Sequence, residues 1–335
     1  MKYVLSWHES IKHGGNKAKE DVDRFLKKDG YKVIKTPSNK FLKVLFTYVY
    51  FPILMKCIRN SEIVYQFPSG KPFIRAKLIK SVKRSSNKLI MLIHDIEALR
   101  MNSNNTDNRA TKKVIDDEIM QLKNSDGIIS HNSKMTLWLK KKGVSVPIVN
   151  LEIFDYDNPQ KINQNLNYEG TLCFAGNLGK SSFLKKLELQ HKLDLYGMNP
   201  AENYHKNIHY EGNFSPDELP KNLTQNFGLV WDGPDIDSCR GIYGEYMRFN
   251  NPHKVSLYLS SGIPIIIWKK AAMAEFIQNN NLGIAIEDLK ELDEILDNMT
   301  QEEYVNLKKR VIDMSKSLRN GTHTISAMNK LMSSI

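Results

Sequence analysis

The sequence contains few cysteines, and their spacing gives them no structural role. Its 335 residues include only Cys57, Cys173 and Cys239, which lie far apart and form no CxxC pair. An odd number of isolated cysteines argues against a disulfide framework and a zinc site, and is typical of a reducing compartment. The N-terminal segment MKYVLSWHES also lacks the apolar core and cleavage pattern of a signal peptide. The sequence therefore predicts a cytoplasmic protein.

No apolar run is long and clean enough to predict a membrane-spanning helix. The nearest candidate, residues 41–58 (FLKVLFTYVYFPILMKCI), carries Lys43, Lys56 and a central Pro52. A helix needs about 20 predominantly apolar residues to cross a bilayer, and Pro kinks a helix. The pattern favours a buried or interface helix kinked at Pro52. Its aromatic side chains would face either a sister subunit or the inner face of the membrane.

Acidic residues are outnumbered by basic ones. The chain has 48 Lys and Arg against 37 Asp and Glu, a net charge of +11, and its pI is near 9.3. A basic balance favours anionic partners such as nucleotide phosphates, although an ordinary basic protein is the plain alternative. The lysines are spread over many segments, without a long basic run interleaved with aromatics. Nucleic acid is therefore not expected as a partner.

Strand-like and helix-like segments alternate along most of the chain. Residues 89–94 (LIMLIH) and 263–268 (IPIIIW) are continuous apolar runs, as expected for buried parallel strands. Residues 17–28 instead repeat their apolar positions with a helical period. Repeated β-α units predict parallel sheets with helices on both faces. The fold class is therefore expected to be α/β.

A polar segment divides this alternation into two halves. Residues 155–169 (DYDNPQKINQNLNYE) are rich in Asn and poor in apolar side chains, which predicts a domain linker. The sequence therefore predicts two Rossmann-like lobes with a cleft between them. The N-terminal lobe would cover residues 1–155 and the C-terminal lobe residues 156–318. Residues 319–335 would form a helix that can pack back on the N-terminal lobe.

Two Gly-rich turns follow predicted strands, where open parallel sheets bind ligands. The first, HGGN, contains Gly15 and Asn16; the second, AGNLGKSS, contains Asn177, Gly179 and Lys180. Glycine lets the backbone approach an anion closely, and the next helix offers free N–H groups. The alternatives are that Asn16 caps a helix and that the second turn is only a tight bend. Neither turn is a GxGxxG motif, and Phe174 stands where a phosphate-binding GxxxxGKS motif needs its first glycine.

A third loop, residues 232–261, is the richest in polar and charged side chains. It follows a predicted strand and then opens a helix with the motif NNPHK, which is Asn250, Asn251, Pro252, His253 and Lys254. Pro is favoured near a helix start, so the motif can be read as a stop and a cap. The helix dipole, however, disfavours a cation such as Lys254 in the first turn. A lysine there suits a diphosphate ligand better.

Candidate acid and base groups are few. His94 and Asp95 end the apolar run of residues 89–94, where a carboxylate beside an imidazole can accept a proton from a hydroxyl group. The alternative is that Asp95 caps the following turn. Of three Asp-x-Asp pairs, only Asp235 and Asp237 lie in a suitable loop. No metal site is expected there, because proteins with two Rossmann lobes usually work without a metal ion.

Three segments together resemble a known family. FAGNLGKSSFL, NNPHKVSLYLSSGIPIIIW and MLIHDIEALR are similar to segments of bacterial sugar transferases with two Rossmann lobes, the GT-B architecture. The family includes the second-step glucosyltransferases of serine-rich-repeat adhesin O-glycosylation and galactofuranosyltransferases. The resemblance covers nearly the whole chain and is most specific from NNPHK to GIPIIIW.

The resemblance implies a UDP-sugar in the cleft, with no metal or cofactor. Asn16 and Gly15 would approach the diphosphate, the turn from Asn177 to Lys180 would hold the pyrophosphate, and the NNPHK motif would bind ribose and phosphate. No Glu-x7-Glu pair follows that motif, so ribose binding by Glu is not expected. Asp95 would be the catalytic base, beside His94. The residues expected to select the donor sugar are Asp237, Ser238, Cys239 and Arg240.

The predicted activity is transfer of glucose from UDP-glucose to GlcNAc already attached to Ser or Thr of an adhesin. A different UDP-sugar, such as UDP-GlcNAc or UDP-galactofuranose, and a role in capsule or exopolysaccharide synthesis are the alternatives. A non-catalytic UDP-binding partner of another transferase is a further one. The missing GxGxxG argues against an epimerase or dehydrogenase. Because members of the family associate, a homo-oligomer, either dimer or tetramer, is also expected.

Overall fold

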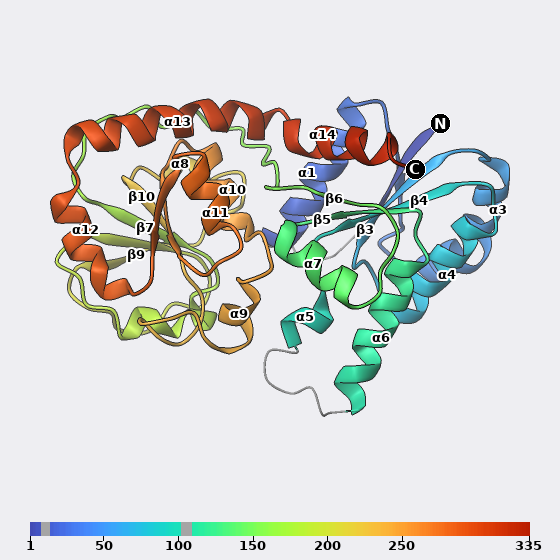
Figure 1. Cartoon of the computed structure of the whole chain (residues 1–335), viewed down its shortest axis with the longest axis horizontal. Helices are drawn as coiled ribbons and strands as arrows, with labels where there is room; N and C mark the ends of the chain where they lie inside the picture. Colours follow the sequence, from blue (N-terminus) through green and yellow to red (C-terminus); the bar gives the residue numbers. More distant parts are fainter. Residues whose placement is uncertain (8–13, 102–108) are drawn as a thin grey trace. The chain divides into compact units, whose positions relative to one another are not determined.

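The computed structural model describes residues 1–7, 14–101 and 109–335 of the chain. The chain divides into two compact units: unit 1 is Met1–Ile153 with Gly321–Ile335, and unit 2 is Phe154–Asn320. Each unit is built on a six-stranded parallel sheet covered by helices (Figure 1). The predicted α/β class with two Rossmann-like sheets is confirmed.

The sheet of unit 1 has the strand order β2-β1-β3-β4-β5-β6. Its central strands are buried along almost their whole length, because helices cover both faces of a parallel sheet. Helix α14 packs against α1, β5 and β6, while α4 packs against α3, α6 and β4. The strands are β1 (Lys2–Ser6), β2 (Lys32–Lys35), β3 (Glu62–Phe67), β4 (Lys88–Ile93), β5 (Gly127–Ser130) and β6 (Ile148–Asn150). The helices are α1 (Gly14–Lys28), α2 (Lys40–Leu45), the π-helix η1 (Phe46–Tyr50), α3 (Phe51–Cys57), α4 (Pro72–Lys83), α5 (Glu97–Met101), α6 (Arg109–Lys123), α7 (Ser133–Lys141) and α14 (Thr322–Met332).

The sheet of unit 2 has the strand order β12-β11-β10-β7-β8-β9. Helix α13 runs along this unit and packs on α10 (Figure 1). The strands are β7 (Leu172–Ala175), β8 (Leu193–Tyr196), β9 (Ile208–Gly212), β10 (Phe227–Val230), β11 (Ile265–Trp268) and β12 (Gly283–Ile286). The helices are η2 (Leu178–Lys180), η3 (Ser182–Lys185), α8 (Leu219–Asn222), α9 (Gly241–Tyr246), α10 (His253–Ser260), α11 (Ala274–Asn279), η4 (Leu289–Glu291), α12 (Leu292–Asn298) and α13 (Gln301–Arg319).

The expected linker at residues 155–169 is a packed segment of unit 2. It contains neither helix nor strand, yet Asn158 is buried and its Nδ2 donates to Ser261 Oγ at 3.2 Å. Asn158, Asn163 and Asn165 each accept a hydrogen bond from the backbone N–H two residues further on, at 2.9–3.0 Å. Asn side chains support an irregular backbone in this way. The Asn-rich composition therefore reflects local hydrogen bonding rather than a free linker.

The helix expected to follow the turn AGNLGKSS is not an α-helix. The structure has two short 3-10 turns, η2 and η3, in place of an α-helix. Gly179 and the Ser181–Ser182 pair are poor helix formers, because glycine costs backbone entropy and serine competes for backbone hydrogen bonds. The segment after β7 is therefore a compact turn.

The apolar run around Pro52 is helical but only half-buried. Helices α2, η1 and α3 follow one another without a break, and Pro52 lies in the first turn of α3. Proline has no N–H to donate, and the wider π-helical turn before it accommodates the missing bond. Phe46, Phe51 and Met55 are buried. No helix in the described part of the chain is both long and apolar enough to cross a membrane.

Lys308 of α13 is buried without an ionic partner. Its side chain is 0% exposed, and its Nζ has no hydrogen-bond partner among the described residues. Burial lowers the pKa of Lys308 to about 8. Because the ammonium form is penalised in the folded state, Lys308 costs unit 2 stability at neutral pH.

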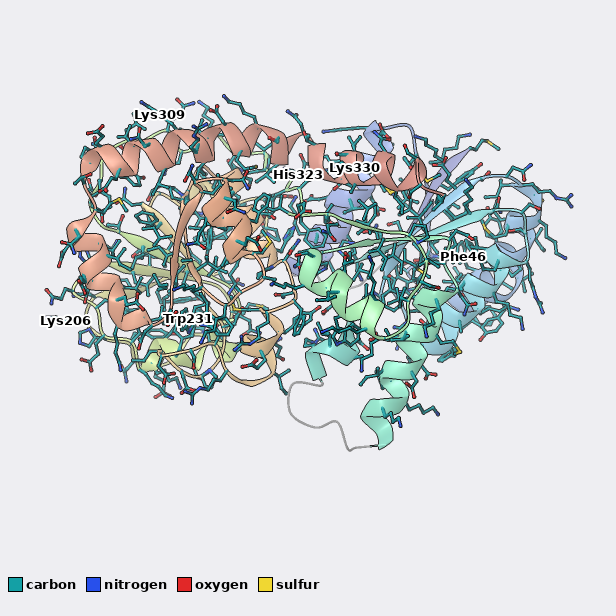
Figure 2. All side chains as sticks on the ribbon, in the orientation of Figure 1. Phe46, Lys206, Trp231, Lys309, His323 and Lys330 are labelled. Carbon is teal, nitrogen blue, oxygen red and sulfur yellow. The ribbon has the colours of Figure 1, made fainter. Side chains whose placement is uncertain are left out.

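Lys308→Met is expected to stabilise unit 2 by about 1–3 kcal/mol at pH 7, since it removes a buried charge and keeps the volume. The unfolded lysine keeps its proton up to about pH 10.5. The wild type therefore gains stability between about pH 8 and 10.5, and the advantage of the variant shrinks over that range. Thermal and urea unfolding at pH 7 and pH 9.5 measure it. Lys309→Met, at the exposed neighbour on α13 (Figure 2), is the control. Equal effects of both variants would contradict the prediction.

Candidate active site

The strand order of unit 2 reverses between β7 and β10. These two strands are neighbours in the sheet, and the chain leaves their carboxyl ends in different directions. Tyr258 lies where they diverge: its Oη accepts a hydrogen bond from Ala175 N at 2.6 Å, and its ring fills the space over Gly228. Doubly wound sheets bind their ligands at such a crevice, beyond the carboxyl ends of the strands.

Lys254 reaches this crevice from the first turn of α10. Its Nζ lies 3.2 Å from Asp232 Oδ1, 3.3 Å from Trp231 O and 4.4 Å from the ring centroid of Phe174. A Cβ placed on Gly176 would be only 4.0 Å from the same Nζ. The lysine therefore touches the loops after both β7 and β10. The free N–H groups at the start of α10 add a second source of positive potential.

The Gly-rich turn after β7 is held in place by hydrogen bonds and by close contact with the segment after β8. Asn177 Oδ1 accepts hydrogen bonds from Gly179 N and from Asn199 Nδ2, both at 3.1 Å. Gly197, with φ of +140°, comes so close that a Cβ there would lie 1.7 Å from Gly176 O. Lys180 Nζ stands 4.5 Å from the ring centroid of Tyr243. The turn is thus held in one shape, with two lysines beside it.

The NNPHK motif brings further polar groups to the same helix start. Asn250 Oδ1 is buried and has no hydrogen-bond partner within the described ranges. Asn251 is buried at 4% exposure, and Pro252 is the N-cap residue of α10. The His253 ring packs on Tyr156, with centroids 5.0 Å apart. Asn250 is therefore the group best placed to accept a hydrogen bond from a ligand hydroxyl.

The loop expected to select the donor sugar is only partly exposed. Asp237 accepts hydrogen bonds from Ser238 Oγ at 3.0 Å and from Arg240 Nη2 at 3.3 Å, and all three side chains are accessible. Cys239, by contrast, is 0% exposed, and burial raises the pKa of its thiol. Cys239 therefore belongs to the core beneath the loop, and it does not offer a surface to a sugar.

The Asp-x-Asp pair in this loop is engaged with basic side chains. Lys186 Nζ lies 2.8 Å from Asp235 Oδ1, and this hydrogen bond lowers the pKa of Asp235. Asp237 is paired with Arg240. Among the described residues, no group of three or more His, Cys, Asp or Glu is arranged to hold a metal ion.

In unit 1, His94 and Asp95 follow the carboxyl end of β4 and have different partners. Arg100 Nη1 lies 2.8 Å from Asp95 Oδ2, and Ile96 N donates to Asp95 Oδ1 at 3.1 Å. His94 Nε2 instead lies 2.7 Å from Gln66 Oε1. An acceptor hydroxyl would have to compete with Arg100 for Asp95, whereas His94 is held by a neutral amide.

The tautomer of His94 follows from Gln66. The Gln66 amide donates from Nε2 to Asp23 Oδ1 at 2.7 Å and to Lys19 O at 3.3 Å. Burial raises the pKa of Asp23 to about 6, so its carboxylate is mostly ionised at neutral pH. Gln66 Oε1 must then accept, and the neutral His94 must donate from Nε2. Nδ1 is therefore the nitrogen that can take up a proton.

A cavity of about 620 Å³ opens beside the ends of β1 and β2. Asn16, Trp7 and Thr36 line it together with basic and acidic side chains of α1. Asn16 is the third residue of α1, so it does not cap the helix, and Gly15 lies one residue before it. An aromatic ring among polar groups suits a carbohydrate.

Models of one protein family match nearly the whole chain. The model described as "Glucosyltransferase 3-like, N-terminal domain" matches residues 1–153, and "Glucosyltransferase 3-like, C-terminal domain" matches residues 172–331. The chain belongs to the glucosyltransferase 3-like family. The resemblance stated from the sequence is therefore confirmed.

Curated relatives of this glucosyltransferase 3-like chain include two kinds of sugar transferase. Beta-1,6-galactofuranosyltransferase WbbI of Escherichia coli (strain K12) is 34% identical over 280 residues, which cover 79% of this chain and 78% of the relative. Glucosyltransferase 3 of Streptococcus gordonii is 28% identical over 263 residues, 77% of this chain and 75% of the relative.

Solved structures support the fold. A sucrose-phosphate synthase from Thermosynechococcus elongatus matches with a TM-score of 0.65 and 10% identity, covering 98% of both chains. The T4 phage BGT in complex with its UDP-glucose substrate matches with a TM-score of 0.55 and 12% identity, covering 97% of this chain and 98% of that one. Both are glycosyltransferases of the GT-B fold, which is the fold of this chain.

The sequence-based prediction omits three residues that the structure places beside the predicted ones. Asp232 lies two residues after the end of β10, a position that could have flagged it. Gln66 is the single amide within the apolar strand β3, which is also a visible signal. Tyr243 lies in α9, within a segment read as loop, and nothing in the sequence marks it as a neighbour of Lys180.

Proposed function

We propose that this protein is a glycosyltransferase that takes a hexose from a UDP-sugar, and that unit 2 binds the UDP. The observation that carries the proposal is the position of Lys254 Nζ at the β7–β10 crevice, beside Gly176 and Asp232. A partly buried lysine, a helix N-terminus and a rigid glycine turn are the groups that stabilise a departing diphosphate. In the free protein Asp232 balances the charge of Lys254.

The reaction assigns a role to each unit. An acceptor hydroxyl oxygen attacks C1 of the sugar, the bond between C1 and the UDP oxygen breaks, and UDP leaves with the bonding electrons. Lys254, Lys180 and the backbone of the Gly176 turn stabilise the negative charge on UDP. The hydroxyl proton goes to the imidazole of His94, whose Nδ1 is buried in the free protein and has to be uncovered as the acceptor binds. Asp95, with Arg100 beside it, is the second candidate for this base.

Glucose is the proposed donor sugar, and GlcNAc on Ser or Thr of an adhesin is the proposed acceptor. The name of the glucosyltransferase 3 relatives supports glucose as the donor sugar. The acceptor rests on the family resemblance alone. Galactofuranose is the second candidate, because the galactofuranosyltransferase relative is 34% identical and the glucosyltransferase relatives 28% and 27%. A panel of UDP-glucose, UDP-galactofuranose and UDP-GlcNAc, each offered with a GlcNAc-bearing peptide and a GlcNAc-terminated glycan, separates these cases. UDP binding without any turnover on the panel would favour a non-catalytic partner protein.

UDP is expected to bind more tightly than ADP or GDP, and to bind equally well in excess EDTA. The preference for UDP rests on the UDP-sugar that the family resemblance implies. The insensitivity to EDTA is expected because lysines and backbone N–H groups, rather than a metal ion, surround the proposed diphosphate position. The carboxylates of Asp235 and Asp237 are occupied by Lys186 and Arg240, which supports the same expectation. Titration calorimetry with and without EDTA is the measurement. Loss of UDP binding in EDTA would contradict it.

A further inference from the structure

Unit 1 exposes an unusual number of large apolar side chains on one helical run. Of the eighteen exposed large apolar side chains in the described ranges, eight lie between Phe41 and Ile53, on α2, η1 and α3. Phe41 is 75% exposed, Tyr50 55% and Ile53 57%. We call this face, with Leu42, Val44, Leu45, Tyr48 and Val49, the apolar face. Monomeric soluble proteins rarely expose so much contiguous apolar surface without a use for it.

The fold of unit 1 does not explain the apolar face. The opposite side of the same run already supplies the packing: Phe46, Phe51 and Met55 are buried, and η1 and α3 pack against α4. Figure 2 shows Phe46 within the crowded helical end of unit 1. A helical run that is apolar on its packed side and on its solvent side is expected to have a second apolar environment.

The charge surplus of the chain coincides with this region. Residues 30–94 contain thirteen Lys and Arg and a single acidic residue, Glu62. Their net charge of +12 is slightly larger than the +11 of the whole chain. Outside this segment the chain has 35 Lys and Arg against 36 Asp and Glu, so the net surplus of positive charge comes from the part of unit 1 that carries the apolar face.

Basic side chains border the apolar face at both ends and along its flank. Lys40 is the first residue of α2, before the apolar face. Lys56, in α3, and Arg59 come after the last residue of the apolar face, and all three side chains are exposed. Lys77 of α4 places its Nζ 5.4 Å from the ring centroid of Tyr48. An apolar stripe with aromatic rings and a basic rim is the pattern of a surface that lies in a membrane interface.

We propose that unit 1 docks on an anionic lipid bilayer, with the apolar face in the headgroup region and its basic rim on the lipid phosphates. No described helix can cross a membrane, so the protein would lie on the surface. A second copy of the chain is a less favourable partner for the apolar face than a bilayer. A two-fold dimer brings the same patch of both copies together, and here that would bring the exposed basic rim of one copy, with Lys40, Lys56 and Arg59, against that of the other.

Vesicle binding tests this proposal directly. The full-length protein is incubated with vesicles of phosphatidylglycerol and phosphatidylcholine or of phosphatidylcholine alone, and the bound fraction is measured by flotation. We expect at least about tenfold tighter binding to the anionic vesicles, and loss of that preference between about 0.1 M and 0.5 M salt. Lys56→Gln with Arg59→Gln should weaken binding about thirtyfold. Val49→Ser with Ile53→Ser should weaken it as well, at either salt concentration.

Two matched variants serve as controls. Leu137→Ser changes an apolar side chain of α7 that is 52% exposed, and Lys140→Gln with Lys141→Gln removes two exposed charges from the same helix. Circular dichroism verifies that every variant is folded. The proposal is overturned by absent vesicle binding, by equal binding to neutral vesicles, or by equal losses in the controls. It is also overturned if Val49→Ser with Ile53→Ser splits an oligomer in light scattering and leaves vesicle binding unchanged.

Discussion

Replacing His94 with Ala is expected to lower kcat for sugar transfer by about 10²–10⁴-fold, the usual contribution of a general base. UDP affinity should change little, because the groups proposed to bind UDP lie in unit 2 and His94 lies in unit 1. Asp95→Asn should retain most of the activity, since that carboxylate is already bonded to Arg100 and Ile96 N. Initial rates of transfer and UDP calorimetry on both variants are the measurements.

The controls for this prediction use the hydrogen-bond chain behind His94. Gln66→Glu places a carboxylate on His94 Nε2 and should move the acidic limb of the pH–rate profile about one unit higher, because a negative neighbour favours the imidazolium. His209→Ala, an exposed histidine on β9, should leave the rate and the profile unchanged. A large loss in Asp95→Asn together with a mild effect of His94→Ala would reverse the assignment.

Replacing Lys254 with Met is expected to weaken UDP binding by about 1.5–3 kcal/mol, the value of a hydrogen bond to a charged group. This corresponds to about 10–150-fold in Kd. Lys254 is 13% exposed and its stem lies on Phe174, so Met keeps the packing while it removes the charge. Titration calorimetry with UDP measures the effect, and thermal unfolding verifies the fold.

Two further variants make the result specific to this position. Lys269 also follows the carboxyl end of a strand, β11, but it is exposed and paired with Glu287 at 3.1 Å. Lys269→Met should therefore change UDP affinity less than about twofold. Asp232→Asn frees Lys254 from its counter-charge and should not weaken UDP binding. Normal UDP affinity in a folded Lys254→Met protein would show that Lys254 does not bind UDP.

The periodicity of the sequence was enough to predict the architecture. Buried parallel strands are continuous apolar runs, and they are separated by helical repeats and turns. The apolar runs predicted as buried strands, residues 89–94 and 263–268, contain most of β4 and all of β11. The family could also be recognised, because the motifs FAGNLGKSS and NNPHK are local in the chain.

Elements that depend on distant partners could not be read in the same way. Residues 155–169 look like a linker because their amides are polar. In the structure Asn158 donates to Ser261, and Asn side chains also accept from nearby backbone N–H groups within the segment. Cys239 lies in a polar loop, a position that predicts a ligand contact, yet its side chain is completely buried. Composition reports the polarity of a segment, whereas burial depends on what folds over it.

For the candidate site, the sequence by itself determined which turns and which titratable residues follow the strands, and where the surplus of positive charge lies. Only the tertiary structure decided which of these groups meet. Lys254 joins Asp232 and the Gly176 turn because β7 and β10 are adjacent in the sheet, although residues 175 and 231 are far apart in the chain. Likewise His94 is oriented by Gln66 and Asp23, which come from β3 and α1. Such contacts between side chains distant in sequence are set by strand order and register, which no local pattern encodes.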